Sequence, residues 1–152
     1  LTRDKYDPCC GTPLFDAIGK TVKKIKKDTK DIEDAAVLVT IITDGYENSS
    51  KEWTGPMVKK LIDECKEEGW MFSFIGAGED VVKVATTISI TNTVVWEQTS
   101  EGTAEMFENE NQARNRFYDK MAAPCCGAPM SKEERKAMKR RLAEEYYDED
   151  KK

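Results

Sequence analysis

An apolar, β-branched segment at residues 36–43, with the sequence AVLVTIIT, constrains the fold of this chain more than any other feature. A strand has this composition when helices cover both faces of a parallel sheet, because neither side of the strand then meets water. The segment ends at Asp44-Gly45, a polar turn. Ligands of such sheets bind at the carboxyl ends of the strands, so we expect Asp44 to lie at a ligand-binding edge.

Helical and strand-like patterns alternate along the chain. They predict strands at 36–43, 70–75 and 88–96 (with Asn92 as a point where the last strand can break), and helices from Pro13 to the charged loop at 30–34, at 54–68, at 80–86 and at 103–121. Thr12 and Asp80 are expected as helix N-caps. The helix at 54–68 is expected to turn inward Met57, Leu61, Ile62 and Cys65. The helix at 103–121 is expected to turn inward Phe107, Phe117 and Met121. The alternation predicts an α/β fold, a Rossmann-like three-layer parallel sheet with helices on both faces.

The composition changes after residue 122. We expect a domain at residues 1–122, a Pro/Cys/Gly linker at 123–130 and a charged helical tail at 131–152. Ser131 and Glu134 have the spacing of a capping box, which predicts a helix start. The helix that follows has a thin apolar stripe, so we interpret it as a solvated or partner-docking tail.

Charge and composition exclude several classes of function. The net charge is −5, so nucleic acid is not an expected partner. The chain has no histidine, which excludes catalysis by histidine and zinc sites that use histidine ligands. No apolar run approaches the roughly 20 residues of a membrane span, and no signal peptide is expected. The lysine run at 20–27 fits either the solvated face of a helix or a site for an anionic partner.

Five cysteines are present, and an odd count with Cys65 on an apolar helix face indicates a reducing compartment, the cytoplasm or a virion. Cys9-Cys10 and Cys125-Cys126 lie in near-copies of one Pro-Cys-Cys-Gly-x-Pro sequence. These copies are either turns or a four-thiolate zinc site, although adjacent cysteines converge poorly on one ion.

Thr12 and Asp44 are the candidate site residues. If the start of the first helix and the end of the 36–43 strand share one sheet edge, the hydroxyl and the carboxylate converge on a small polar site. Hard oxygen ligands of this kind suit Mg²⁺ or Ca²⁺. The alternatives are that Thr12 is a plain N-cap and that Asp44 is a turn residue whose side chain caps nearby amides.

Three motifs resemble a known family. CGTPLFDAIG (10–19) resembles the Gly-x-Thr-x-Leu-x-Asp-Ala helix start of von Willebrand factor type A domains, IITDGYEN (41–48) resembles the Thr-Asp-Gly turn of that family, and FSFIGAG (72–78) resembles its next strand and turn. The similarity covers about residues 6–120. It is closest to bacterial and phage members, which commonly continue Glu-Asn-Ser-Ser as residues 47–50 do here.

The resemblance implies a metal-ion-dependent adhesion site for Mg²⁺. Thr12 matches the threonine ligand of the family, and Asp44 matches its aspartate, which often acts through water. The Asp-x-Ser-x-Ser loop of the family has no match in this sequence.

By the same resemblance, the chain corresponds to strands 4, 5 and 6 of a sheet with the order 3-2-1-4-5-6. The segment 36–43 would then be an edge strand, and an apolar, uncharged edge favours pairing with another strand. We therefore expect that the chain is a fragment of a longer protein, or that another chain or self-association completes the sheet at 36–43.

These observations favour a protein-binding module with an incomplete Mg²⁺ site, and not an enzyme. The first alternative is a structural component of a phage particle or a multi-protein complex without metal, with residues 131–152 as the docking element. The second is a nucleotide-binding α/β enzyme that cradles a phosphate at Gly76-Ala77-Gly78-Glu79. That loop lacks the full Gly-x-Gly-x-x-Gly pattern and a P-loop lysine.

Overall fold

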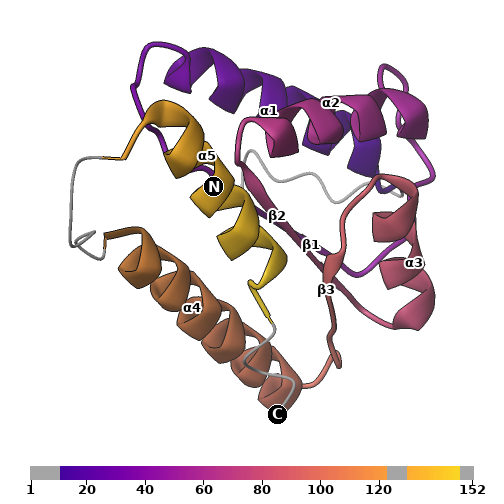
Figure 1. The fold of residues 1–152 in the computed structure, drawn as a ribbon. Coiled ribbons are helices and arrows are strands. Elements are labelled where there is room, and N and C mark those ends of the chain that lie inside the picture. The colour runs from indigo at the N-terminus through magenta and orange to yellow at the C-terminus, as the bar shows by residue number, and fades with distance from the viewer. Residues whose placement is uncertain (1–10, 123–129, 148–152) are drawn as a thin grey trace, which may run out of the picture.

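The computed structural model describes residues 11–122 and 130–147 (Figure 1). In these residues five helices surround three strands, in the order α1 (Leu14–Thr29), β1 (Leu38–Thr43), α2 (Gly55–Glu67), β2 (Met71–Gly76), α3 (Glu79–Thr87), β3 (Asn92–Val95), α4 (Ser100–Ala122) and α5 (Lys132–Glu144). The strands are parallel, with the spatial order β1-β2-β3. The expected α/β fold, with half of a Rossmann-like sheet, is confirmed.

The sheet has a core on each face, because successive side chains of β2 point to opposite sides. Phe72 and Phe74 pack into a cluster with residues of α1, α2 and α3. Met71 packs on the other face with residues of α4 and α5, including Phe117 and Leu142. Figure 1 shows α1 and α2 on one side of the sheet and α4 and α5 on the other. The result is a three-layer architecture.

The third strand is shorter than predicted. Only Asn92–Val95 pair with β2, whereas Ile88 and Ile90 are fully buried in the turn after α3. Ser89 lies between them with a φ of 64°, a left-handed conformation that no strand contains. The apolar residues at 88–90 therefore fill the core from a turn, although their composition predicts a strand.

Three predicted helix features differ in the structure. Met57 is exposed and Val58 is buried in its place, because the inward stripe of α2 runs through Val58, Leu61, Ile62 and Cys65. Phe107 is also exposed, since the inward stripe of α4 is Met106, Glu110, Ala113 and Phe117. Asp80 is not a helix N-cap: α3 begins one residue earlier, with Gly78 as its cap.

Helix α5 packs on the sheet, in contrast to the expected solvated or partner-docking tail. Leu142 and Ala143 are buried against Met71, and the predicted capping box of Ser131 and Glu134 is present. Lys139 is only 5% exposed. A stripe of three or four residues is enough to dock this helix because long charged side chains cover the remaining apolar surface.

Ion pairs fix α5 to the segment before β1. The Lys139 ammonium lies 2.8 Å from the Asp34 carboxylate and donates to the Ala35 carbonyl oxygen at 2.9 Å. Arg135 pairs with the same carboxylate of Asp34. The linker at 123–130, apart from Met130, lies outside the described residues, as do both cysteine pairs.

A buried carboxylate joins α4 to β1 and to the residues after α5. Glu110 is 2% exposed and accepts hydrogen bonds from the hydroxyls of Thr40, Tyr146 and Tyr147. Arg114 donates to it from the next turn of α4, at 3.2 Å. A buried carboxylate with this many donors is well compensated. Glu110 therefore stabilises the core on the α4/α5 face of the sheet, called the second core below.

Two environmental findings complete the fold. Cys65 is buried, and the loss of solvent around it raises the pKa of its thiol to about 11, which keeps the thiol protonated at neutral pH. Across the described ranges, no helix combines the length and the apolar character that a membrane crossing requires.

Candidate functional site

Thr12 and the turn after β1 lie together at the carboxyl edge of the sheet. A Cβ atom added to Gly45 would come within 2.8 Å of the Thr12 hydroxyl oxygen, so this hydroxyl rests against the residue that follows Asp44. Asp44 itself is exposed. The structure therefore brings the two candidate residues to one edge, and Gly45 lets the Thr12 hydroxyl come this close to the turn.

Thr43 shapes the turn that presents Asp44. Its hydroxyl accepts a hydrogen bond from the Gly45 N–H at 3.3 Å and donates to the Gly45 carbonyl oxygen at 3.0 Å. The side chain is buried, so these local bonds also satisfy a hydroxyl that water does not reach. Sequence reasoning missed this role.

The prediction that Thr12 is an N-cap is wrong. Helix α1 begins at Leu14, its cap residue is Pro13, and no side chain of the cap residue bonds the first turn. The loop after β1 satisfies these amides instead: the Phe15 N–H donates to Glu47 at 2.7 Å, and the Asp16 N–H donates to the Ser50 hydroxyl at 3.0 Å. The Thr12 hydroxyl is thereby left to face the turn at Gly45.

Glu47 is the centre of this arrangement. Besides the Phe15 amide, its carboxylate accepts the amides of Ser49 and Ser50 at 3.0 and 2.8 Å and the Ser50 hydroxyl at 2.7 Å. Burial alone raises the pKa of Glu47, but these hydrogen bonds outweigh it and lower the pKa below its usual value. The carboxylate thus stays charged and lies at the start of α1, where the helix dipole favours an anion.

Asn48 contacts Thr12 directly. The Thr12 N–H donates to the Asn48 side-chain oxygen at 2.8 Å, and the Asn48 N–H donates to the Thr12 carbonyl oxygen at 3.3 Å. Both polar groups of the Thr12 backbone are therefore bonded to a single residue of the loop.

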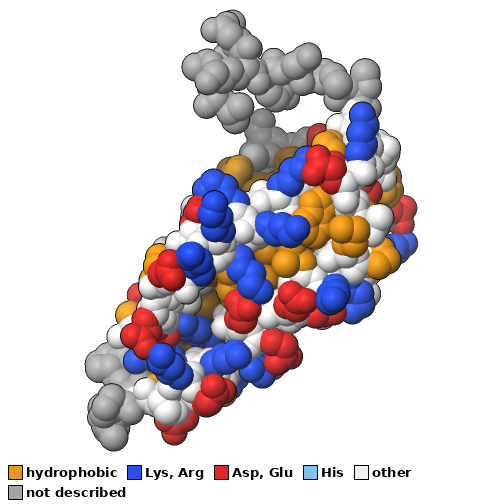
Figure 2. Space-filling view, turned by 90° about the horizontal axis from the view of Figure 1, so that it is seen from above, with side chains coloured by type: hydrophobic (Ala, Val, Ile, Leu, Met, Phe, Trp, Pro, Cys, Tyr) orange, Lys and Arg blue, Asp and Glu red, His pale blue; other side chains and the backbone are white. Residues whose placement is uncertain are grey.

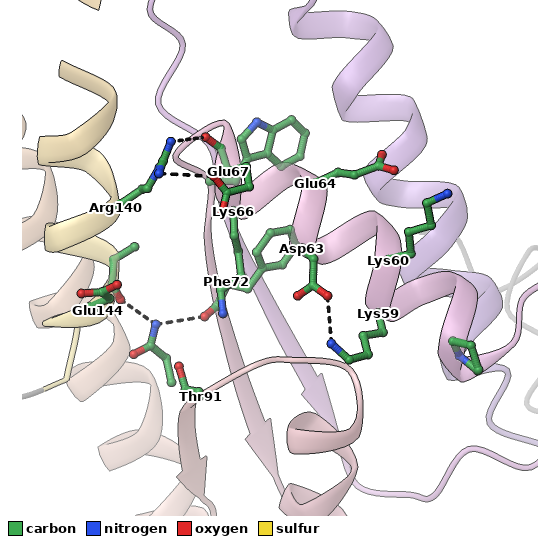
Figure 3. Close-up of a pocket in the computed structure, with 14 residues that line it drawn as sticks. Lys59, Lys60, Asp63, Glu64, Lys66, Glu67, Phe72, Thr91, Arg140 and Glu144 are labelled. Atoms are coloured by element: carbon green, nitrogen blue, oxygen red, sulfur yellow. Dashed lines mark hydrogen bonds and ion pairs between the residues drawn. The ribbon is translucent and has the colours of Figure 1, made fainter. Parts of the chain in front are cut away.

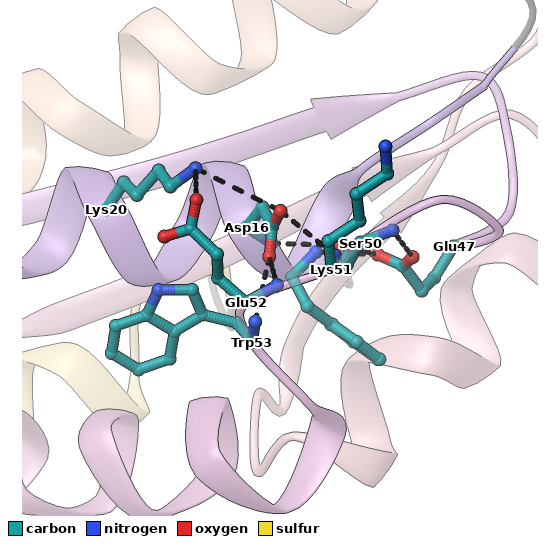
Figure 4. A network of polar contacts seen from close by, with 8 residues as sticks. Asp16, Lys20, Glu47, Ser50, Lys51, Glu52 and Trp53 are labelled. Carbon is teal, nitrogen blue, oxygen red and sulfur yellow. Dashed lines mark hydrogen bonds and ion pairs between the residues drawn. The ribbon is translucent and has the colours of Figure 1, made fainter.

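Asp16 holds the second half of the loop (Figure 4). Its carboxylate accepts the backbone amides of Lys51, Glu52 and Trp53 at 3.1, 3.0 and 2.8 Å. The hydrogen bond from the Lys51 amide, followed by those from Trp53 and Glu52, lowers the pKa of Asp16 against the opposing effect of burial. Residues 47–53 and the first turns of α1 therefore form one hydrogen-bonded unit.

Several exposed apolar side chains lie along the carboxyl edge of the sheet. Ile42, Tyr46, Met57 and Val95 are between 44% and 53% exposed. They lie at the end of β1, in the following loop, at the start of α2 and at the end of β3, and all of these positions belong to the carboxyl edge of a parallel sheet. Ile42 pairs with Ile75 and Val95 pairs with Gly76, so these two side chains point to opposite faces of the sheet and do not form one patch.

The lysines of α1 are largely paired. Lys20 lies 2.7 Å from Glu52, Lys26 lies 2.9 Å from Glu68, and Lys24 pairs with Asp28 one helical turn away. Figure 2, seen from the side of α1 and α2, shows Lys/Arg and Asp/Glu side chains interspersed over this face. The lysine run is thus a mixed-charge, solvated helix face.

A cavity of about 960 Å³ lies at the opposite edge of the sheet, between α2 and α5 (Figure 3). Part of its charged lining pairs internally: Lys59 bonds Asp63 at 2.9 Å, and Arg140 lies 3.3 Å from Glu67. Asn92 donates to the carbonyl oxygens of Phe72 and Ala143. Neither Thr12 nor Asp44 lines this cavity.

The turn at 76–78 is tightly packed. A Cβ atom on Gly76 would lie 3.0–3.2 Å from the side chains of Val81 and Val82, and Gly78 caps α3 with a φ of 110°. Packing explains the glycine at position 76 and backbone conformation explains the glycine at position 78, so neither requires a bound phosphate.

The donor set at Thr12 and Asp44, one hydroxyl and one carboxylate, fits part of the coordination sphere of Mg²⁺. The cradle at Gly45 accommodates the hydroxyl. Within residues 11–122 and 130–147, no group of three or more His, Cys, Asp or Glu side chains is placed to hold a metal ion. The two residues therefore need ligands from elsewhere for tight binding.

Comparison with known protein families, with curated proteins and with solved structures finds no match to this chain.

Proposed function

We propose that this chain is a protein-binding module of the von Willebrand factor A type, in which Thr12 and Asp44 are two ligands of a divalent metal site. The observation that supports this most is the contact between the Thr12 hydroxyl and Gly45, the residue that follows Asp44 at the carboxyl edge of the sheet. A bound Mg²⁺ would supply a positive centre that an acidic side chain of a partner can complete.

An exposed apolar side chain supports a protein as the partner. Tyr46, two residues after Asp44, is 53% exposed and would contribute hydrophobic contact beside the polar centre, while Thr12 and Asp44 fix the position of the partner's carboxylate. Asp44 is exposed and therefore accessible to a partner.

The free edge of β1 supports completion of the sheet by a further strand. Met71 N–H donates to the Val37 carbonyl and Ala77 N–H donates to the Thr43 carbonyl, so the odd-numbered residues of β1 pair with β2. In a parallel ladder the alternate residues, Leu38, Thr40 and Ile42, then direct their N–H and C=O groups away from β2. No strand pairs with that side within the described residues, and a strand added there can carry the remaining metal ligands.

The test is a titration of the isotope-labelled chain followed by NMR. We expect Mg²⁺ to shift the amide signals of Thr12 and of residues 44–46 selectively, and ATP without metal to leave them unchanged. Signals that move at Gly76–Glu79 with nucleotide would support the enzyme alternative instead. If no signal near Thr12 responds to Mg²⁺ in the millimolar range, the metal site is refuted.

The same edge favours one alternative, an assembly component without metal. Self-association through β1 would be concentration-dependent and independent of Mg²⁺. Light scattering with and without EDTA separates the two: a dimer that persists in EDTA and disappears on Ile42→Pro, which removes an outward-facing N–H at an exposed position, supports assembly.

A further inference from the structure

Thr12 is positioned by the loop that follows Asp44 as well as by its own helix. We propose that Asn48 and Glu47 are positioning residues: they hold the Thr12 hydroxyl against Gly45, the residue after Asp44, and thereby set the metal affinity of the site without contacting the ion. The affinity part of this inference rests on the proposed metal site, whereas the positioning part does not.

Asn48 acts on Thr12 itself. It closes a two-point contact with the Thr12 backbone, in which its side chain accepts the Thr12 N–H and its own N–H donates to the Thr12 carbonyl. Thr12 precedes α1, so no helical hydrogen bond restrains its N–H. Without the Asn48 side chain, that N–H loses its partner, and residue 12 keeps only the bonds that its carbonyl oxygen accepts from the N–H groups of Leu14 and Asn48.

Glu47 acts on the elements that carry Thr12 and Asp44. One carboxylate bonds the Phe15 amide at the start of α1 and the amides of Ser49 and Ser50 in its own loop. It therefore couples the helix that follows Thr12 to the loop that follows Asp44. Residues that orient metal ligands in this way typically change metal affinity by about 10–100-fold when they are replaced.

Asp16 provides a matched control. It also joins α1 to the same loop through three hydrogen bonds, but its partners are Lys51, Glu52 and Trp53, four or more residues beyond Glu47. Its replacement destabilises the unit and leaves the contact between Asn48 and Thr12 intact. An effect that only reflects lost stability would therefore appear in both variants.

The experiment compares wild type, Asn48→Ala and Asp16→Asn well below their unfolding temperatures. Asn48 is neutral, so its replacement removes no charge near the ion. The first measurement uses the metal-free protein and detects the NOE between the Thr12 side chain and the Gly45 Hα atoms. We expect this NOE in wild type and in Asp16→Asn, and its loss in Asn48→Ala.

The second measurement is the paramagnetic broadening of the Asp44 and Gly45 amides by Mn²⁺. We expect an affinity at least about tenfold weaker in Asn48→Ala and within twofold of wild type in Asp16→Asn. If Asn48→Ala keeps the NOE, or if both variants lose affinity equally, the positioning role is refuted. If wild type shows no broadening, the proposed metal site fails, and the NOE alone still decides the positioning role.

Discussion

The indole ring of Trp53 lies against Gly19, so closely that a Cβ atom on Gly19 would come within 2.1 Å of the ring. The Trp53 amide donates to Asp16 one turn earlier on α1, and the Lys23 ammonium lies 4.7 Å from the ring centroid one turn later. Trp53, at the end of the loop, thus packs directly on α1, and this contact helps to fix the position of residues 47–53.

Gly19→Ala should therefore destabilise the protein. Replacing glycine by alanine inside a helix normally stabilises by about 0.5–1 kcal/mol, whereas overpacking a core contact costs about 1–3 kcal/mol. We expect overpacking to dominate and the urea midpoint to fall. Thr21→Ala, at an exposed position of the same helix, is the control and should not lower the midpoint; a Gly19→Ala protein as stable as wild type would contradict the contact.

Tyr147→Phe should loosen the second core. The hydroxyl of Tyr147 donates to the buried carboxylate of Glu110, and a hydrogen bond to a charged group contributes about 1.5–3 kcal/mol. Tyr118, on α4 but exposed, provides the matched control, and its replacement by Phe should change stability by no more than about 0.5 kcal/mol. Equal effects of the two substitutions would contradict the role of Glu110.

The same tyrosine predicts alkaline sensitivity. Burial, together with the neighbouring Glu110 carboxylate, raises the pKa of Tyr147, so the folded state favours the protonated phenol. Its contribution to stability is present below the unfolded pKa of about 10 and is lost as the pH rises above it. Unfolding midpoints measured between pH 8 and 11 should fall less steeply in Tyr147→Phe than in wild type.

Glu47 predicts the opposite dependence at acid pH. Its hydrogen bonds lower the pKa in the folded state below the ordinary value of 4.5, so its stabilisation is present above that value and is lost as the pH falls below it. Glu47→Gln should therefore be less stable than wild type at pH 7, and the difference should shrink toward pH 3.

Lys139 should anchor α5. Breaking a buried ion pair costs roughly 3–5 kcal/mol when the other charge stays unpaired; we expect about 2 kcal/mol for Lys139→Ala, because Arg135 still pairs with Asp34. Lys132→Ala, which removes an exposed pair with Glu33, should cost at most about 1 kcal/mol. Hydrogen exchange in α5 should accelerate only in the first variant.

The α/β architecture could be predicted from the sequence because it rests on local patterns. The buried β2 strand and the stripe at Leu61, Ile62 and Cys65 follow from apolar spacing alone. The fate of α5 could not be predicted, since its docking depends on ion pairs between Lys139, Arg135 and Asp34, which are about 100 residues apart.

The candidate site also has features that could be predicted from the sequence and features that could not. That Thr12 and Asp44 share one edge follows from the topology of parallel strands. The contacts of Glu47, Asn48 and Asp16 could not be derived, because each joins backbone amides more than 30 residues away. Thr12 was predicted as an N-cap since a threonine before Pro13 has the usual local signature, and only the fold shows that Glu47 and Ser50 bond those amides instead.

The most direct test of the metal site is a double-mutant cycle on Mn²⁺ affinity with Thr12→Ala, Asp44→Asn and the double variant. If the two side chains bind one ion, each single variant should weaken binding, and the double variant should lose much less than the sum of the two free-energy changes. Additive losses, or a wild-type affinity retained by all three variants, would contradict a shared site at Thr12 and Asp44.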